Sequence, residues 1–460
     1  MSLTKLHNRM ITGASANIKD FGAVGDGVTD DSVAIQAAFD SGSLNVLVPE
    51  GTYIISVALV PVANQTIIFV GEIKIDPTLL IGAVPHSIIR VNYDNVTLVN
   101  PRLDGSSDVI SDTGGQSGVY SVVAGYGSGG NDNLRIYGGT IKNGIHNLIQ
   151  GGSRGLIIDG TTLSAAGEHL VYINQTDGAG GTTGTQASIL NCILNAPYES
   201  ATHTEGHYFQ IRNTGRVLID NCYCYGAGSL GSSAPTFAVL FENSLSLTVT
   251  NSSFLNLTNK ILWQDSGDTL FGNCVFNVLA GISSLNMLKA DGAGTVAFKG
   301  CDFTKFYTID FQPTKLQFID CAIETATLFT LAADVDLKGC SFNGTNDTQF
   351  ITVTAGYVVI EGCTFTGTGL SVTVSTVASA RIQANYFPDI ASGSNHISVT
   401  GASTGNVQIL GNSLPAAVST STIKTSAAVV TKTIIVGNFL PLGVINDLSA
   451  IAVSTGNATV

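Results

Sequence analysis

Hydrophobic and polar positions alternate in short runs that recur along most of this chain. The run VDLKGCSFNG begins at Val335, and VVIEGCTFTG begins at Val358. Each run has two apolar residues at period 2, then two bend residues, and then two apolar residues one step out of phase. Because successive side chains of a strand point to opposite faces, the bend is a corner at which the strand turns and keeps its apolar face inside.

This corner template fits fifteen times along the sequence. The residue after the corner lies at 71, 101, 139, 161, 192, 222, 252, 274, 301, 321, 340, 363, 385, 412 and 438. The corner residue is Gly, Asn or Asp in thirteen of these coils, and Val70 and Ala384 are the exceptions. Gly, Asn and Asp tolerate the left-handed conformation that such a corner requires. The repeat predicts an all-β fold, a single-stranded right-handed parallel β-helix in which each coil stacks on its neighbours.

The cysteines follow the same register. Seven of the eight lie directly after a corner, at Cys192, Cys222, Cys274, Cys301, Cys321, Cys340 and Cys363. Cys224 lies two residues further on and therefore on the same face. Such a column suits either a metal cluster or disulfides, or a buried stack of small apolar side chains. We favour the buried stack, because a chain made in the cytoplasm keeps its thiols reduced.

A short capping helix is expected near the N-terminus. Thr29, Asp30 and Asp31 form an N-cap signal before SVAIQAAFDSG, and Gly42 ends the helix. A helix there covers the strand edges of the first coil, which would otherwise be open. The expected domains are a lead-in at 1–17, an N-terminal cap at 18–60, the parallel β-helix at 61–440 and a C-terminal tail or cap at 441–460.

Charge is scarce and mostly acidic. Charged residues make up 12% of the chain, against roughly 25% in an average protein. The net charge of −13 argues against a nucleic-acid partner, which needs a basic face. An uncharged polar surface rich in hydroxyls and amides suits sugars instead. The acids at 26, 30 and 31 lack the spacing of an EF-hand loop, so we expect neither a metal nor another cofactor.

Neither a membrane span nor a signal peptide is indicated. No run approaches the ~20 apolar residues of a membrane helix. The opening MSLTKLHNRMITG also lacks the apolar stretch of a signal peptide. We therefore expect a protein that is made in the cytoplasm and does not insert into membranes.

Long coils indicate where function lies. Insertions in a solenoid become loops on one face, which is often the binding face. The longest loops fall at 104–118, 176–186, 196–206 and 226–235. The loop at 196–206 contains Glu199, His203 and Glu205, a concentration of titratable groups in a chain with little charge.

Four strands between these loops align with one another. They read HLVYIN (169–174), HYFQIR (207–212), FAVLFE (237–242) and NKILWQ (259–264). The expected inward side chains are Val171, Ile173, Phe209, Ile211, Val239, Phe241, Ile261 and Trp263. The outward side chains are then Tyr172, Asn174, Tyr208, Gln210, Arg212, Glu242, Lys260 and Gln264. Aromatic rings beside charged and amide groups on a flat sheet suit a sugar chain, although Arg212 and Glu242 alone would also fit an ordinary ladder pair.

Two segments near the start carry a family resemblance. Residues 18–39, IKDFGAVGDGVTDDSVAIQAAF, and residues 46–55, VLVPEGTYII, resemble the opening of the pectate-lyase-like β-helix superfamily. Within it they are most similar to bacteriophage tailspikes, and the lead-in KLHNRMI is typical of phage spikes. The resemblance implies a virion tail protein that binds and cuts a bacterial capsule, exopolysaccharide or lipopolysaccharide O-chain. It also implies a parallel homotrimer, attached to a phage tail or adaptor protein through the N-terminus.

Glycoside hydrolysis is the reaction we expect. It needs two carboxylates, ~5 Å apart for retention or ~6.5–9.5 Å apart for inversion. The candidate acids are Glu168, Glu205, Glu242 and Asp265. We expect Glu242, kept ionised by Arg212, to act together with Glu205 or Glu168.

Two other functions stay open. A lyase needs a base and positive groups to remove a proton beside a uronate carboxylate, and His203, His207, Arg212 and Tyr208 could supply these. A receptor-binding spike without catalysis would have the same fold and no usable carboxylate pair. In every case the expected substrate-binding residues are Tyr172, Tyr208, Arg212, His203, His207 and Gln210.

Overall fold

A computed structural model gives the structure of the chain. It describes residues 15–78, 87–107, 121–125, 132–152, 154–174, 186–195, 206–226, 237–257, 260–278, 286–290, 294–306, 308–309, 313–325, 329–344, 351–366, 372–387, 396–400, 405–414, 423–425, 432–439, 445–447 and 452–455. The chain divides into two compact units, Met1–Leu247 and Thr248–Val460, and each is described by itself.

Unit 1 is built from three parallel sheets. The first holds β1 (Ala16–Asn17), β3 (Asn45–Val48), β5 (Thr66–Phe69), β8 (Thr97–Val99), β11 (Arg135–Tyr137), β14 (Leu156–Asp159), β17 (Gln186–Leu190) and β20 (Arg216–Asp220). The second holds β2 (Asp26–Asp30), β4 (Thr52–Ile55), β6 (Glu72–Ile75), β9 (Arg102–Asp104), β12 (Thr140–Gly144), β15 (Thr162–Ala166), β18 (Ile193–Asn195) and β21 (Tyr223–Tyr225). The third holds β7 (Ile89–Val91), β10 (Ser121–Gly125), β13 (Asn147–Gly151), β16 (His169–Asn174), β19 (His207–Arg212) and β22 (Phe237–Glu242).

Unit 2 repeats the plan after β23 (Ser246–Thr250), in which the division falls. Its first sheet holds β26 (Asp268–Gly272), β29 (Thr295–Lys299), β32 (Lys315–Ile319), β35 (Asp334–Lys338), β38 (Tyr357–Glu361), β41 (Ser379–Gln383), β43 (Asn406–Leu410), β45 (Lys432–Val436) and β47 (Ala452–Thr455). The second holds β24 (Ser253–Leu257), β27 (Val275–Val278), β30 (Asp302–Phe306), β33 (Ala322–Thr325), β36 (Ser341–Gly344) and β39 (Thr364–Thr366). Opposite these run β25 (Lys260–Gln264), β28 (Asn286–Ala290) and β31 (Thr308–Ile309), and then β34 (Phe329–Leu331), β37 (Ile351–Val353), β40 (Val372–Ser375), β42 (Ile397–Thr400), β44 (Ile423–Thr425) and β46 (Ile445–Asp447).

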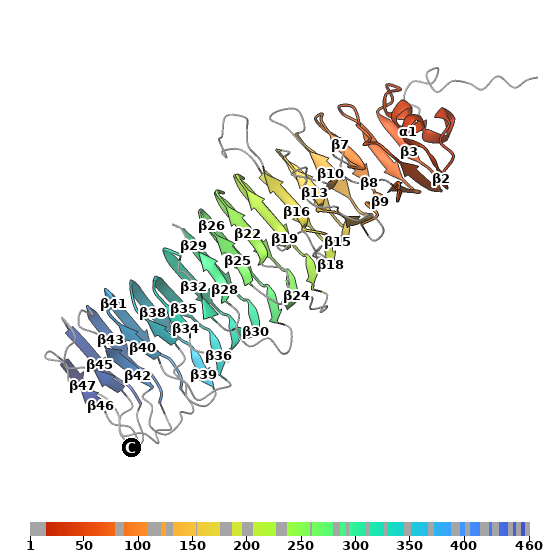
Figure 1. Cartoon of the computed structure of the whole chain (residues 1–460). Coiled ribbons are helices and arrows are strands. Elements are labelled where there is room, and N and C mark those ends of the chain that lie inside the picture. The colour runs from red at the N-terminus through yellow and green to blue at the C-terminus, as the bar shows by residue number, and fades with distance from the viewer. Residues whose placement is uncertain are drawn as a thin grey trace, which may run out of the picture. The chain divides into compact units, whose positions relative to one another are not determined.

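Each strand pairs in parallel with its counterpart one coil away. In unit 1, for example, β15 pairs with β18 and β16 with β19 (Figure 1), and β14 pairs with β17 in the same way. A chain that visits three sheets in turn and then stacks on itself is a parallel β-helix. The fold expected from the corner repeat is confirmed.

The left-handed corners are also confirmed. All thirteen expected Gly, Asn and Asp corner residues have positive φ, such as Asn221 at 52° and Gly362 at 65°. Ala384 has φ 55° although it carries a Cβ, whereas Val70 is not among the positive-φ residues. Asparagine adds a side-chain ladder at these corners, since Asn221 Nδ2 donates to Asn191 Oδ1 over 2.8 Å.

The interior is a set of stacked columns. Phe254, Phe276 and Phe303 stack with ring centroids 5.3 and 5.0 Å apart, close to the ~4.8 Å between neighbouring strands. All eight cysteines lie in the described part of the chain as buried thiols. Cys340 Sγ, for example, donates to Phe318 O on the preceding coil over 3.3 Å. The interpretation of the cysteines as a buried stack is confirmed.

The N-terminal helix is present where the sequence predicts it. α1 (Ser32–Phe39) begins directly after Asp31 and follows the 3₁₀ helix η2 (Ile18–Phe21). The Asp31 carboxylate accepts hydrogen bonds from Val24 N and Gly25 N and leaves the helix end uncapped by its side chain. Asp30 Oδ1 accepts from Ser32 N instead, over 2.9 Å. Asp30 and Asp31 therefore accept hydrogen bonds from backbone N–H groups close to them in the sequence.

Parallel pairing extends beyond the expected domain boundaries. β1 pairs with β3 ahead of residue 61, and β45 pairs with β47 after residue 440. The division into lead-in, cap, β-helix and tail stays a prediction. Among the described residues, no helix is both long and apolar enough to cross a membrane.

Candidate functional site

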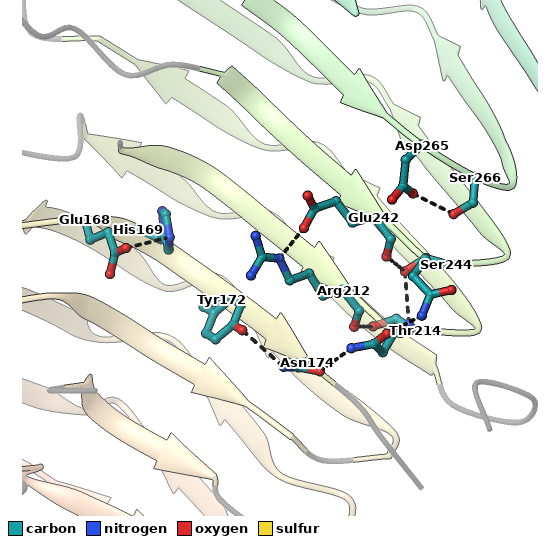
Figure 2. A network of polar contacts seen from close by, with 12 residues as sticks. Glu168, His169, Tyr172, Asn174, Arg212, Thr214, Glu242, Ser244, Asp265 and Ser266 are labelled. Carbon is teal, nitrogen blue, oxygen red and sulfur yellow. Dashed lines mark hydrogen bonds and ion pairs between the residues drawn. The ribbon is translucent and has the colours of Figure 1, made fainter. Parts of the chain in front are cut away.

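The outer face of the third sheet in unit 1 carries a continuous set of polar side chains. The register aligns Tyr172 with Gln210, and Asn174 with Arg212 and Glu242, across β16, β19 and β22. We call these residues, with His169 at the start of β16 and Glu168 directly before it, the polar patch: Glu168, His169, Tyr172, Asn174, Gln210, Arg212 and Glu242. Figure 2 labels all of them except Gln210. The expected inward residues on these three strands are fully buried, which keeps the patch on the outside.

An ion pair closes one end of the patch. Arg212 and Glu242 are direct partners on neighbouring strands, and Arg212 Nε donates to Glu242 Oε2. The Arg212 side chain is 40% exposed and that of Glu242 16% exposed, so the guanidinium is the more accessible partner. Asn174 lies one coil away from Arg212 and donates to the Tyr172 hydroxyl over 3.1 Å.

Gln210 connects this ion pair to the other end of the patch. One end of its amide is 2.6 Å from His169 Nε2, and the other end is 3.0 Å from Arg212 Nη2. The side chain is nearly buried, with 7% exposure. A single planar amide therefore sets the spacing between an imidazole and a guanidinium.

A carboxylate and two imidazoles form the opposite end. Glu168 Oε1 lies 3.4 Å from His169 Nε2, and Glu168 Oε2 lies 3.8 Å from His146 Nδ1. The Glu168 side chain is 28% exposed, against 4% for His169 and 8% for His146. His169 stacks on His207 with centroids 4.8 Å apart and planes at 10°. Glu168 is thus the accessible group of this end, and the buried imidazoles of His169 and His146 contact its carboxylate.

Sequence reasoning missed His146 and His169. A signal for His169 was present, because histidine opens both HLVYIN and HYFQIR and so occupies the same register position as His207. His207 itself is 1% exposed. Its expected contact with substrate is wrong, because its ring lies against His169 instead.

Two further expectations need correction. Tyr208 is 1% exposed, because two successive buried residues, Tyr208 and Phe209, interrupt the period-2 alternation at the start of β19. Burial raises the pKa of its phenol, and the ring cannot offer a face to a sugar. In unit 2, Ile261 is buried as expected, but Trp263 is half-buried and Gln264 is buried, so the faces assigned to Trp263 and Gln264 are wrong.

Several expected site residues lie outside the described residues. These are Glu199, His203 and Glu205, together with most of the long loops, at 108–118, 176–185, 196–205 and 227–235. In the part of the chain that is described, no group of three or more His, Cys, Asp or Glu residues is arranged to hold a metal ion.

The register separates Glu168 from Glu242. His169 aligns with His207 and then with Phe237, which precedes Glu242 by five residues. At ~3.3 Å per residue and ~4.8 Å per strand, the two Cα atoms are roughly 20 Å apart. Glycosidase carboxylates lie ~5–9.5 Å apart. The register therefore argues against the expected pairing of Glu168 with Glu242 within one chain.

Known proteins match parts of the chain. Mannuronan C5-epimerase AlgE6 of Azotobacter vinelandii is 56% identical over 46 residues, which is 9% of this chain and 5% of the epimerase. Plasmin and fibronectin-binding protein A of Streptococcus pneumoniae is 28% identical over 211 residues, 45% of this chain and 23% of that protein. The chain thus spans under a quarter of either relative.

A solved structure with a similar backbone is that of a mutant tailspike protein of E. coli bacteriophage HK620 in complex with a hexasaccharide. It is 14% identical, covers 92% of this chain and 75% of its own, and has a TM-score of 0.46.

The family match is broader and includes the polar patch. The model described as rhamnogalacturonase A/epimerase, pectate lyase-like, matches residues 15–282. That range is more than half of the chain, and it confirms the superfamily resemblance of the opening segments. This chain belongs to the rhamnogalacturonase A/epimerase, pectate-lyase-like family.

Proposed function

We propose that this protein binds a bacterial surface polysaccharide along the polar patch and cleaves it, as a tailspike-type depolymerase. The observation that carries the proposal is the line from Glu168 through His169 and Gln210 to Arg212. It puts an accessible acid or base and an accessible cation on one face, linked through an imidazole and an amide. Membership of a family named for rhamnogalacturonase and epimerase supports a carbohydrate substrate.

Binding would rest on Arg212, Tyr172 and Gln210. The guanidinium of Arg212 is 40% exposed, and its planar fork suits the carboxylate of an acidic sugar. Tyr172 is half-buried and keeps its hydroxyl at the edge of the patch, where Asn174 holds it. Gln210 fixes the direction of the guanidinium, so that Arg212 is oriented before a ligand arrives.

β-Elimination is the reaction that this geometry supports best. Glu168 would remove the proton beside a uronate carboxylate, and Arg212, five residues further along the sheet than the position aligned with His169, would bind the carboxylate of another sugar of the same chain. The electron pair of the broken C–H bond would form the new C=C bond as the C–O bond breaks, and the departing glycosidic oxygen would take up a proton from solvent. His169 and His146 would act as positioning residues that hold the Glu168 carboxylate.

Hydrolysis is the second candidate, on one observation. The backbone N–H of His207 donates to Glu168 O over 3.2 Å, so the chain that follows Glu205 by two residues runs beside Glu168. A hydrolase would therefore draw its carboxylate pair from Glu168 and Glu205. Glu242, which is already committed to Arg212, would have no direct role in the reaction.

Trimer formation and phage attachment belong to the same proposal. A parallel homotrimer in the virion tail, joined to a tail or adaptor protein through residues 1–17, is what the tailspike resemblance implies. Light scattering on the purified protein tests this part alone. A mass three times that of one chain supports it, and the mass of a single chain contradicts it.

Incubation with purified capsules, exopolysaccharides and O-chains from a panel of bacteria tests the function. Products that absorb in the ultraviolet carry a new double bond and support elimination. New reducing ends without such absorbance would assign hydrolysis. Binding without either product would make the protein a receptor-binding spike, and no binding to any polysaccharide would contradict the proposal.

A further inference from the structure

A groove lies on the outer face of the first sheet in unit 2. It crosses β38, β41 and β43, which are successive strands of that sheet (Figure 1). The register forms two outward rows, Tyr357–Ser379–Asn406 and Val359–Arg381–Gln408. These rows enclose about 390 Å³, a volume in the range of small-molecule sites. We call it the tyrosine groove.

Side-chain size explains why the sheet is hollowed here. Ser379 is the small residue of its row, between Tyr357 and Asn406. Beneath it, Val358 and Ala380 are buried and form an apolar floor. Tyr357 is 63% exposed, so most of its ring is available as a wall of the groove.

The polar groups of the groove make few contacts within the described part of the chain. Within the described part of the chain, the hydroxyl of Ser379 and the side-chain amides of Asn406 and Gln408 make no hydrogen bond. Arg381 is 47% exposed and has only a 3.9 Å contact with Glu361.

Amides on the same sheet but outside the groove are satisfied. Gln317 Nε2 donates to Asp336 Oδ2 over 2.8 Å, and Gln383 Nε2 donates to Glu361 Oε1 over 2.6 Å. The amides of the groove therefore differ from these two amides of the same sheet, which are hydrogen-bonded to carboxylates of the protein.

We propose that the tyrosine groove is a second carbohydrate-binding site, which holds a saccharide unit without cleaving it. An exposed aromatic ring stacks on the C–H face of a sugar, and planar amide and guanidinium groups bind its hydroxyls. The lining residues that the structure describes include no carboxylate and no imidazole, so the groove has no acid or base for bond cleavage. This site is independent of the reaction at the polar patch.

An array of immobilised bacterial capsular and O-chain saccharides tests this proposal. All proteins carry Glu168→Gln, so that the probes stay intact. Tyr357→Ala and Arg381→Ala should each weaken binding to the same subset of saccharides at least tenfold. Tyr386→Ala removes a 44% exposed tyrosine of unit 2 outside the groove, and it should leave that binding unchanged.

Three results would overturn the groove proposal. One is equal binding of every saccharide by the groove variants and the control, and another is an array on which nothing binds. The third is a fall in oligomeric mass on Tyr357→Ala, which would make the groove a contact between copies of the chain. Cleavage is measured separately on the protein with Glu168 intact. This assay tests the polar patch alone, so its result is independent of the binding result for the groove.

Discussion

Arg212 and Glu242 face each other across neighbouring parallel strands, and the guanidinium donates to the carboxylate. Glu242 is the less exposed partner, and Gln210 contacts the same guanidinium from two residues earlier on β19. Because the Glu242 carboxylate already accepts a hydrogen bond from Arg212, it is better placed to orient the guanidinium than to transfer a proton. We therefore assign Glu242 a positioning role toward Arg212.

Glu242→Gln should weaken substrate binding and preserve turnover. Loss of the charge-assisted hydrogen bond releases Arg212 from its fixed direction, at a cost of about 1.5–3 kcal/mol. We expect KM to rise at least tenfold while kcat changes less than threefold. Both are measured on a polysaccharide that the parent protein cleaves. Glu324→Gln, a half-buried glutamate on β33, is the matched control. A kcat that falls 10²-fold or more would make Glu242 an acid or base instead.

The stacked left-handed corner residues predict opposite changes in stability for two small substitutions. Ala384 has a left-handed conformation that Gly adopts without strain, so Ala384→Gly should stabilise the protein by about 0.5–1 kcal/mol. Gly362 occupies the previous corner, where an added Cβ meets nothing closer than 3.9 Å. Gly362→Ala should therefore cost about 1 kcal/mol from backbone strain alone.

Denaturant unfolding of both corner variants measures these changes. Ala380→Gly, in the extended strand β41 just before Ala384, serves as the control and should destabilise the protein. Stabilisation by Gly362→Ala, or destabilisation by Ala384→Gly, would contradict the corner assignment.

Asp104 should stabilise unit 1 in a pH-dependent way. Burial opposes ionisation, but hydrogen bonds from Ser106 N and Asn143 together with Lys142 and Lys74 hold the pKa of Asp104 below its usual value. A lowered pKa means that the stabilisation is complete above about pH 4, the value of an unfolded aspartate, and is lost as the pH falls through the folded-state pKa.

Asp104→Asn should therefore cost about 1.5–3 kcal/mol of unfolding free energy at pH 7 and less below about pH 4. Urea titrations at both pH values measure the difference. The exposed Asp20→Asn is the control and should have little effect at either pH. A cost that stays constant down to pH 2 would show that the charge of Asp104 is not the cause.

The cysteine column should be unreactive in the native protein. A hydrogen bond to Cys274 and burial raise the pKa of Cys301 to about 12, and Cys301 is 1% exposed. A thiol reagent at pH 8 should find less than about one group per chain before unfolding and all eight afterwards. Rapid reaction of several thiols in the native state would contradict the coil register.

The fold was predictable because it repeats. A corner that needs Gly or Asn recurs every coil, so each prediction is checked by its neighbours, and even Ala384 occupies the conformation of its column. The polar patch was only partly predictable. Arg212 and Glu242 follow from period-2 alternation, whereas Tyr208 does not, because the alternation breaks where β19 begins.

Distance along the strand was the hardest property to predict. Glu168 and Glu242 both lie near the aligned strands in the sequence, but they occupy opposite strand ends. His146 reaches Glu168 from the preceding coil, and no single-strand pattern marks such a contact. Cross-coil contacts of this kind depend on register and on side-chain direction together.

Comparison of the parent protein with Glu168→Gln, on an acidic polysaccharide that the parent degrades, tests whether Glu168 performs the cleavage. Ultraviolet absorbance and reducing ends are followed in the same reaction, with binding measured in parallel. We predict that the parent produces both signals and that Glu168→Gln loses both by about 10²–10⁴-fold while it still binds the polysaccharide. Degradation by Glu168→Gln at close to the parent rate would exclude Glu168 as the catalytic acid or base and place the chemistry outside the polar patch.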